Sequence, residues 1–456
     1  MKLRNKHLGK RTLLIAIAGA LAACSGSPGS DEVEVASAGF RPSTAIKVEI
    51  EASDDGYRLL RGGAPYFIKG AGLDFGDLRS FAAHGGNSIR TWTTTNEVVS
   101  TQQLLDKAHA NGVTVALCLE MGAEHRGFDY DDRDAVAAQL EEFRSEVLKY
   151  RDHPALLVWI IGNELNFDYT NSNVYDAVND VSKMIHEIDP NHPTTTTITG
   201  VANREREFRD IATRAADLDF VSFQVYGELE ILPRVIEEIE YDKPFFVTEW
   251  GAVGHWEVDK TTWGAPIEQT SSEKAATYMR GYTEKLARLE NRLIGSYVFL
   301  WGQKQERTPT WYGLFAETGE ETEAVDVMHH IWSGEWPDNR SPRLESMSLD
   351  GKAAAQSVTL RSGESYTATV DVSDYENDPL VYRWELKEES RATQKGGDFE
   401  ESIPNLAGLI ENPTAPSTTI RAPAAGAYRL FAYAYDDHGH AAHANIPFLV
   451  SDSGAE

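Results

Sequence analysis

The sequence predicts an α/β fold, a (β/α)8 TIM barrel followed by a small all-β sandwich. Between residues 66 and 302, eight short apolar runs alternate with segments in which apolar residues recur every three or four positions. Eight strands joined by crossover helices over about 240 residues are typical of a TIM barrel. A doubly wound open sheet is the main alternative, but no glycine-rich phosphate loop follows the first run. The last roughly 110 residues alternate apolar and polar positions, as strands of a sandwich do.

The N-terminus is typical of an export signal. Five basic residues precede an apolar run from Leu13 to Ala23 that is too short to span a membrane. Leu21-Ala22-Ala23-Cys24 resembles the lipobox of bacterial lipoproteins, whose cysteine is lipidated and becomes the mature N-terminus. The resemblance implies a signal peptide over residues 1–23, a lipid anchor on Cys24 and, since Ser25 rather than Asp follows, the outer membrane of the cell envelope. An ordinary secretory signal with a chance cysteine is the alternative.

Residues 24–44 are predicted to be a flexible tether, because Ser, Gly and Pro dominate its start. The other cysteine, Cys118, lies in an apolar run where a thiol behaves as a small buried hydrophobe, so no disulfide is expected. The formal net charge is −28, and loss of the five basic residues of the signal would change it to −33. Such a charge repels polyanions and argues against a nucleic-acid partner.

The barrel domain is predicted over residues 45–335. Two β-prone runs, Lys47 to Ile50 and Tyr57 to Leu60, flank the turn signal Asp54-Asp55-Gly56 and predict a hairpin over the base of the barrel. The intervening helices are amphipathic, as the segment from Val174 to Ile188 illustrates. The eight predicted barrel strands span 66–70, 87–92, 113–119, 156–161, 194–199, 220–225, 245–248 and 295–300.

The all-β domain is predicted over residues 336–456, after a segment with two prolines, and four of its strands are expected at 366–372, 380–386, 418–421 and 428–435. The stretches 374–384 and 426–439 resemble Ig-like sandwiches of the polycystic-kidney-disease or cadherin type, which bacterial enzymes carry as accessory modules. Acidic residues at its loop ends are explained by calcium binding or by solvated turns. The histidines of His438-Gly-His440-Ala-Ala-His443 are expected in a solvated loop rather than as metal ligands.

Two of the predicted barrel strands end in glutamate. The run from Ala155 ends in Asn163-Glu164 at the fourth strand, and the run from Phe245 ends in Glu249 at the seventh. Active sites of TIM barrels lie at the carboxyl ends of the strands. Strands four and seven are not adjacent, so their ends face each other across the mouth. Hydrolysis of a glycosidic bond with retention of configuration needs two carboxyl groups about 5 to 5.5 Å apart. Because the two strand ends face each other, the pair favours catalysis over a structural role.

Gly-Asn163-Glu164 and Thr-Glu249-Trp-Gly, at these two strand ends, resemble the paired signatures of glycoside hydrolase clan A. The resemblance implies that Glu164 is the general acid/base, Glu249 is the nucleophile and Asn163 hydrogen-bonds the sugar 2-hydroxyl. One departure is that strand five ends at Gly200 without the histidine that several clan members use, while His192 lies before that strand.

Other strand ends match the same clan pattern. The pattern implies that Arg90 and Tyr226 hold the nucleophile and that Trp301 forms the floor under the sugar. Trp92 and Glu120 are the loop residues most expected to contact the sugar, and the further rim candidates are His125, Arg126, Trp250 and Trp256. Packing within the protein remains the alternative role for each of these side chains.

The expected function is that of a retaining β-glycosidase. Phe67-Ile-Lys69-Gly70 and Asn87-Ser-Ile-Arg90 resemble family 2 enzymes, and Gly-Asn163-Glu-Leu-Asn166 resembles β-1,3-glucanosyltransferases. The two sandwiches that precede the barrel in family 2 exo-enzymes are not recognised, which favours an open cleft and an endo-β-glucanase or β-glucanosyltransferase acting on a neutral β-linked glycan. The alternatives are an exo-acting family 2-type enzyme and a non-catalytic glycan-binding surface lipoprotein. No motif indicates a metal site or a cofactor.

Overall fold

A computed structural model describes residues 44–452 except 97, 240 and 394–395. The predicted signal peptide, Cys24 and nearly all of the predicted tether lie outside the described residues. Within the described part of the chain, no helix combines the length and the apolar character needed to cross a membrane.

A small antiparallel sheet precedes the barrel, as the turn signal predicts. It consists of β1 (Val48–Ser53), β2 (Gly56–Arg61) and β3 (Ala64–Pro65). The amide of Val48 donates to the carbonyl oxygen of Asn191, which lies just before a barrel strand. Side chains of Val48 and Leu59 pack with those inside the barrel. The sheet therefore closes the amino-terminal end of the barrel and leaves the carboxyl ends of the strands open.

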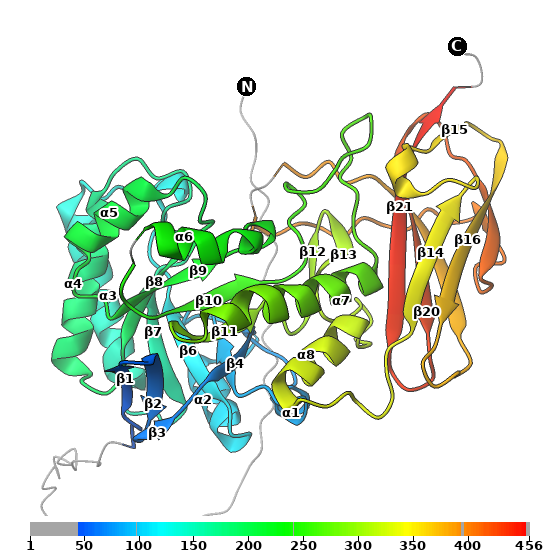
Figure 1. Cartoon of the computed structure of the whole chain (residues 1–456). Helices are drawn as coiled ribbons and strands as arrows, with labels where there is room; N and C mark the ends of the chain where they lie inside the picture. The colour runs from blue at the N-terminus through cyan, green and yellow to red at the C-terminus, as the bar shows by residue number, and fades with distance from the viewer. Residues whose placement is uncertain (1–43, 97, 240, 394–395, 453–456) are drawn as a thin grey trace, which may run out of the picture. The chain divides into compact units, whose positions relative to one another are not determined.

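Eight parallel strands form a closed barrel, and the predicted fold is confirmed (Figure 1). The last strand pairs with the first, so no strand is left at an edge. Each predicted strand overlaps an observed one, and the fourth and fifth agree at both ends. In chain order the strands are β4 (Ile68–Gly72), β5 (Ser88–Arg90), β6 (Thr114–Leu119), β7 (Leu156–Ile161), β8 (Thr194–Thr199), β9 (Phe220–Gln224), β10 (Phe245–Trp250) and β11 (Leu293–Val298).

Helices cover the outside of the barrel, since their apolar faces match the outward-facing side chains of the strands. The α-helices are α1 (Leu78–Ala83), α2 (Thr101–Ala110), α3 (Arg133–Tyr150), α4 (Asn173–Ile188), α5 (Glu205–Arg214), α6 (Leu232–Glu238), α7 (Ser271–Arg280) and α8 (Glu323–Ser333). Shorter helical turns are η1 (Glu124–Arg126), η2 (Gly227–Glu230), η3 (Gly281–Lys285), η4 (Leu286–Leu289) and η5 (Ala354–Gln356). After β11 the chain forms a hairpin of β12 (Gln303–Glu306) and β13 (Thr308–Gly313) at the mouth of the barrel.

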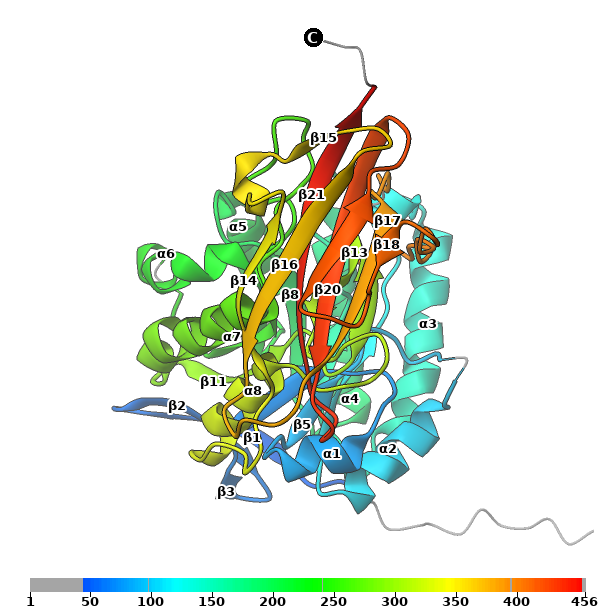
Figure 2. The same cartoon turned by 90° about the vertical axis from the view of Figure 1, so that its right-hand side faces the viewer.

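The C-terminal part is all-β, as predicted. Its strands run side by side in two four-stranded sheets (Figure 2). One sheet has the order β14 (Arg343–Leu349), β16 (Ser365–Ser373), β19 (Ser417–Arg421), β18 (Ile410–Glu411). The other has the order β15 (Thr359–Arg361), β21 (Ala441–Ser451), β20 (Gly426–Tyr435), β17 (Val381–Glu388). The likeness to Ig-like modules and the domain limit at residue 336 stay predictions.

The sheet that contains β20 and β21 packs against the barrel domain. The amide of His443 donates to Ser271 Oγ at 3.0 Å, and Arg429 Nη2 donates to the carbonyl oxygen of Pro266 at 2.8 Å. His443 is 4 % exposed, so the expectation that it lies in a solvated loop is wrong. Because one face of β21 meets the barrel and the other meets the second sheet, nearly all of its residues are buried. Barrel and sheets belong to one compact unit.

Candidate active site

A cavity of about 750 Å³ lies at the carboxyl ends of the barrel strands. Its walls come from residues that follow the strands, from the β12–β13 hairpin, and from Gly396 and Gly397 of the C-terminal part. A second pocket of about 380 Å³ shares Glu120 and Arg126 with it and extends it past the loop after β6. The volume is typical of sites that enclose drug-sized ligands, which are larger than one sugar ring.

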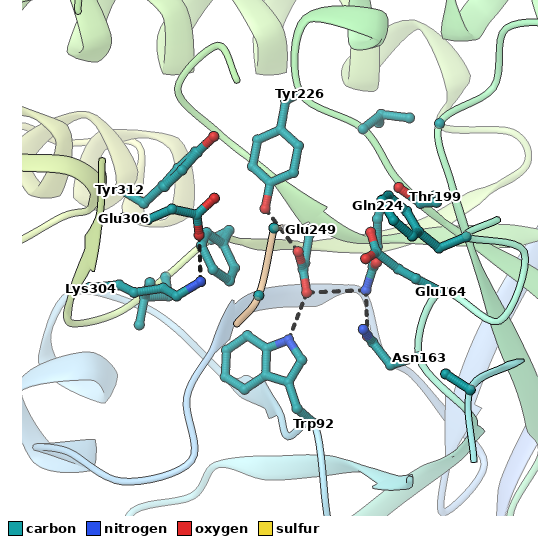
Figure 3. A pocket seen from close by; sticks show the side chains of 18 of the residues that line it. Trp92, Asn163, Glu164, Thr199, Gln224, Tyr226, Glu249, Lys304, Glu306 and Tyr312 are labelled. Atoms are coloured by element: carbon teal, nitrogen blue, oxygen red, sulfur yellow. Dashed lines mark hydrogen bonds and ion pairs between the residues drawn. The ribbon is translucent and has the colours of Figure 1, made fainter. Parts of the chain in front are cut away.

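Glu249 lies near the end of β10 and is 6 % exposed, and four donors surround its carboxylate, of which Figure 3 shows Trp92, Gln224 and Tyr226. Its Oε1 accepts hydrogen bonds from Arg90 Nη1 at 2.5 Å, Trp92 Nε1 at 2.7 Å and Gln224 Nε2 at 3.1 Å. Its Oε2 accepts from the Tyr226 hydroxyl at 2.8 Å. Hydrogen bonds to the charged form favour that form, and so does the guanidinium of Arg90. The arrangement fixes the position of the Glu249 carboxylate in the cavity.

Strand alternation explains why Trp250 is not part of the site. Successive side chains of a strand point to opposite faces, so Trp250 points away from the cavity that Glu249 faces. It is 1 % exposed and packs against Tyr278 and Tyr282 on the helical side. The expectation of a rim position for Trp250 is therefore wrong.

Glu164 follows β7 in a left-handed backbone conformation with a φ of 51°. Its amide donates to Thr197 Oγ1 at 2.9 Å, and the Thr199 hydroxyl bonds its carboxyl group. Burial, followed by the charge of Glu249, raises the pKa of Glu164 to about 7. A carboxyl group with such a pKa is about half protonated at pH 7 and can therefore act as a proton donor there.

Asn163 is oriented by two donors. Its Oδ1 accepts from Arg90 Nη2 at 2.8 Å and from Gln224 Nε2 at 2.7 Å. Both bonds identify the oxygen of the amide, so the Nδ2 group is the one that remains to donate to a ligand. The two donors also bond Glu249, which means that Asn163 and Glu249 are held by the same side chains.

Gln224 is a site residue that the sequence analysis missed. It lies at the end of β9, is 1 % exposed and links Asn163 to Glu249. Its position two residues before Tyr226 was the available signal, because side chains two apart on a strand share a face. Burial, followed by the charge of Glu249, raises the pKa of Tyr226 well above its ordinary value, so its hydroxyl stays a donor.

Trp301 lines the cavity, but most of its ring packs inside the protein. It is 3 % exposed and makes edge contacts with Phe81 and Phe315 at 5.2 Å between ring centroids. The sequence analysis did not single out Phe299. Its ring lies closer to the donors that bond Glu249, with ring centroids 5.7 Å from Trp92 and 6.0 Å from Tyr226. Phe299 is thus better placed than Trp301 to contact a sugar.

Glu120 and Arg126 lie on the outer wall, where both are exposed and their charged groups are 3.6 Å apart. His125 packs on Phe167 at 5.4 Å, and Trp256 is 51 % exposed with its edge on Tyr226. His192 pairs with Asp189 at the opposite end of β8, as its place before the strand predicts.

A third carboxylate in the cavity was also missed. Glu306 ends β12 and is 4 % exposed. Burial alone would raise its pKa, but hydrogen bonds from His255 at 3.2 Å and Lys304 at 2.5 Å lower the pKa of Glu306 below its ordinary value. The charge of Lys304 is thereby neutralised. No strand signal in Gln303-Lys304-Gln-Glu306 indicated this position.

Two groups of possible metal ligands occur in the described part of the chain, both in the C-terminal loops. One comprises Asp374, Glu376 and Asp378, and the other comprises Asp378, Asp437 and His438, each with ligand atoms within 4.8 Å of one another. They are the loop-end carboxylates expected from the sequence, and exposed acidic groups of this kind are common without an ion. Neither group belongs to the cavity.

Comparison with known proteins agrees with the geometry. Residues 76–261 match the family model described as glycosyl hydrolases family 2, TIM barrel domain. The matched segment contains both Glu164 and Glu249. The barrel of this chain is therefore similar to the TIM-barrel domain of family 2 glycosyl hydrolases. None of the curated proteins matches the sequence.

Solved structures of glycosidases are similar to this chain at low identity. A Bacteroides uniformis β-glucuronidase has 12% identity and a TM-score of 0.47, over 89% of this chain and 48% of that chain. A putative β-galactosidase from Bacteroides fragilis has 14% identity and a TM-score of 0.45, over 90% and 58%. The exo-β-1,4-mannosidase Op5Man5 from Opitutaceae bacterium strain TAV5 has 13% identity and a TM-score of 0.45, over 63% and 62%. This chain spans about half the length of the first of them, and likeness at this level does not indicate a substrate.

Proposed function

We propose that the protein is a retaining β-glycosidase that acts through a glycosyl-enzyme intermediate. Glu249 is the nucleophile and Glu164 the general acid/base. The observation that carries the proposal is the different surroundings of the two carboxyl groups: four donors, one of them the Arg90 guanidinium, point at Glu249, while burial and the charge of Glu249 raise the pKa of Glu164 to about 7. A retaining mechanism needs this combination, because one group must attack while the other gives a proton.

In the first step, a Glu249 oxygen forms a bond to the anomeric carbon while the bond from that carbon to the glycosidic oxygen breaks. Glu164 passes its proton to the departing oxygen. In the second step, Glu164 takes a proton from water, or from a sugar hydroxyl, whose oxygen displaces Glu249 from the anomeric carbon. Asn163 Nδ2 donates to the 2-hydroxyl of the sugar, where hydrogen bonds strengthen in the transition state.

The charges of the cavity favour a neutral glycan. Each lysine or arginine of the described residues that lines the cavity has a carboxylate partner: Arg126 pairs with Glu120, Arg204 with Glu207, and Lys304 with Glu306. A uronate or sulfate group would lie beside carboxylates, and no unpaired lysine or arginine among the described cavity residues would balance its charge. Two exposed rings in the wall, Phe75 and Trp256, offer surfaces for the apolar faces of sugar rings.

The substrate class that we propose is a neutral β-glucan, cleaved internally or transferred to another sugar. The extension of the cavity into the second pocket supports binding of several sugar units. The site acts at the cell envelope, on a chain lipid-anchored through Cys24 in the outer membrane, which the lipobox-like sequence supports. An exo-acting family 2-type enzyme is the second candidate, supported by the family match.

The test combines labelling with product analysis. A 2-deoxy-2-fluoro-β-glucoside with a good leaving group should add its sugar mass to Glu249, detected by peptide mass spectrometry. β-Linked glucans, mannans, galactans and aryl glycosides identify the substrate, with Glu164→Gln and Glu249→Gln as controls. Glycan binding without a label or turnover would contradict the proposal and indicate a non-catalytic binding protein.

A further inference from the structure

The loop between β17 and β18, residues 389–409, connects the C-terminal sheets to the mouth of the barrel. Figure 1 shows this orange segment leaving the sheets and running toward the barrel. At its start, Glu389 accepts hydrogen bonds from Arg429 at 2.7 and 3.0 Å, and Arg429 in turn binds the barrel through Pro266. Arg429 is 2 % exposed, so the start of the loop is fixed to both parts of the protein.

Two contacts hold the middle of the loop on the barrel. Asp398 Oδ1 accepts from Arg126 Nη2 at 3.1 Å, in the loop after β6. Glu400 is 7 % exposed and accepts from the amide of Arg307 at 2.8 Å, in the turn of the β12–β13 hairpin. The loop after β6 follows the third barrel strand, whereas the hairpin follows the eighth. The segment from 396 to 400 therefore bridges the mouth above the first two strands.

The bridging segment forms part of the cavity wall. Gly396 and Gly397 both line the cavity, and a Cβ atom on Gly396 would lie 3.7 Å from Glu306 Oε1. Glycine leaves backbone groups uncovered, so a ligand can approach them closely. The C-terminal part is thus in contact with the same space as Glu164 and Glu249.

The contact between Arg126, Glu120 and Asp398 has the chemistry of a sugar subsite. Arg126 is 55 % exposed on its side chain and lies 3.6 Å from Glu120 and 3.1 Å from Asp398. A guanidinium has five N–H donors and each carboxylate can accept several hydrogen bonds. Donors and acceptors placed side by side match neighbouring sugar hydroxyls, each of which both donates and accepts. Because two carboxylates flank the one guanidinium, Arg126 has no positive charge to spare for an anionic ring, which again favours an uncharged one.

We propose that residues 396–400, together with Glu120 and Arg126, form a sugar subsite remote from the cleaved bond, so that the C-terminal domain takes part in substrate binding rather than serving as a separate module. The subsite takes a neutral pyranose unit of a β-linked chain. This inference rests on the proposed function for its ligand class. On this proposal, the C-terminal domain selects substrates by the length of the glycan rather than by the identity of one sugar.

Calorimetric binding tests the subsite apart from catalysis. The probes are β-1,3- and β-1,4-linked gluco-oligosaccharides of two to six units, titrated into full-length protein that carries Glu249→Gln. Affinity should rise with length, and Asp398→Asn and Arg126→Ala should each remove most of that gain, about tenfold for the longest probe, as expected for loss of hydrogen bonds to charged groups. Gly396→Leu, which fills the cavity beside Glu306 and leaves both anchors intact, should have the same effect.

Asp176→Asn is the matched control, because Asp176 pairs with Arg214 at 2.6 Å and has similar exposure but lies outside the cavity. It should leave the length dependence unchanged. Absence of binding, affinity that does not depend on length, or length dependence that survives the three subsite variants would overturn the inference. Failure of the proposed function is recognised separately, by a wild-type protein that binds oligosaccharides but takes no label on Glu249.

Discussion

Glu164 and Glu249 are chemically identical side chains whose neighbours give them different surroundings. Glu249 has four donors around its carboxylate, and Glu164 has two threonine hydroxyl groups nearby and the charge of Glu249 opposite. The roles of the two residues thus follow from which strand ends carry arginine, glutamine and tyrosine. The sequence analysis assigned them by resemblance, and the geometry supplies a physical reason for the same assignment.

The pH dependence of activity should follow Glu164. Its pKa is about 7, and the reaction needs its protonated form, so kcat/KM should fall as pH rises through about 7. The Glu249 charge is one cause of that pKa, so in Glu249→Gln the Glu164 carboxyl should titrate at lower pH. Rate profiles and carboxyl titration by infrared spectroscopy measure the two effects. If the fall of kcat/KM at high pH kept the same midpoint in every variant near Glu164, Glu164 would not be the group that causes it.

Ionisation of Glu164 should also lower the free energy of unfolding above neutral pH. Because its pKa is raised in the folded state, the folded protein holds the proton more tightly than the unfolded chain, and stability falls as pH rises from about 4.5 to 7. Glu164→Gln removes the penalty, so its gain in Tm over the wild type should be larger at pH 8 than at pH 5. Thermal unfolding at both pH values measures it, and an equal gain at both would contradict the prediction.

Tyr226→Phe removes the one donor that the described residues offer to Glu249 Oε2, and little else. We expect kcat to fall about 100-fold, the lower end of the loss seen when a donor to a developing or reacting oxygen is removed. Tyr130→Phe is the control, because its hydroxyl donates to the carbonyl of Gly122 and lies apart from both glutamates. It should cost about 1 kcal/mol of stability and no activity. Steady-state rates and denaturant unfolding separate the two variants.

At the scale of elements, the ends of strands decide which side chains share the cavity. The end of β11 and the residues after it carry two large rings, Phe299 and Trp301, and the sequence pattern alone favoured Trp301. Packing places Trp301 against α1 and α8 through Phe81 and Trp332. Phe299 instead joins the aromatic cluster around Trp92 and Tyr226.

Substitutions at these two rings should therefore differ in kind. Trp301→Ala should lower the free energy of unfolding by about 3 to 5 kcal/mol, as for other buried aromatic residues. Phe299→Ala should raise KM and lower kcat/KM while costing less stability, because its ring lies beside the site. Unfolding in urea and kinetics on an aryl glycoside measure both. The reverse pattern would identify Trp301 as the floor of the sugar site.

At the scale of the whole molecule, a buried ionic network joins the barrel and the C-terminal sheets. Glu268 is 5 % exposed and bonds Lys274 at 2.5 Å, while its other oxygen accepts from Thr308 and from Asn445, each at 2.7 Å. Burial would raise the pKa of Glu268, but the charge of Lys274 lowers it to about 2. The network is a physical reason to regard the C-terminal part as integral to the enzyme.

Breaking this network on one side should be costly. Glu268→Gln leaves the buried ammonium of Lys274 without its counter-charge and should lower the free energy of unfolding by about 3 to 5 kcal/mol. The double variant Glu268→Gln, Lys274→Met should recover much of that loss, because no charge then remains buried. Chemical unfolding of the two single variants and the double variant gives the coupling energy. Additive effects would show that the pair contributes nothing as a pair.

The sequence by itself determined the barrel, the pair of glutamates and most of their neighbours, because parallel strands bring their ends together in a fixed order. Periodicity identified the strands, and Arg90, Asn163, Glu164, Tyr226 and Glu249 all follow from the strand-end rule. The sandwich was visible for the same reason, although β21 was not, since burial on both faces removes the alternation that marks a strand. The role expected for Trp301 shows the limit, because a strand end places a residue but does not orient its ring.

Only the tertiary structure decided what the loops and the second domain contribute. Glu306, Lys304 and the bridging residues 396–400 reach the cavity through contacts between segments far apart in the chain, such as Arg126 with Asp398. No local pattern encodes such contacts, because each depends on how segments far apart in the chain pack together. The signal peptide and lipid anchor on Cys24 remain properties read from the sequence alone, since they lie outside the described residues. The residues at the strand ends therefore determine which chemical groups the site contains, whereas the packing of distant segments determines the shape of its cleft.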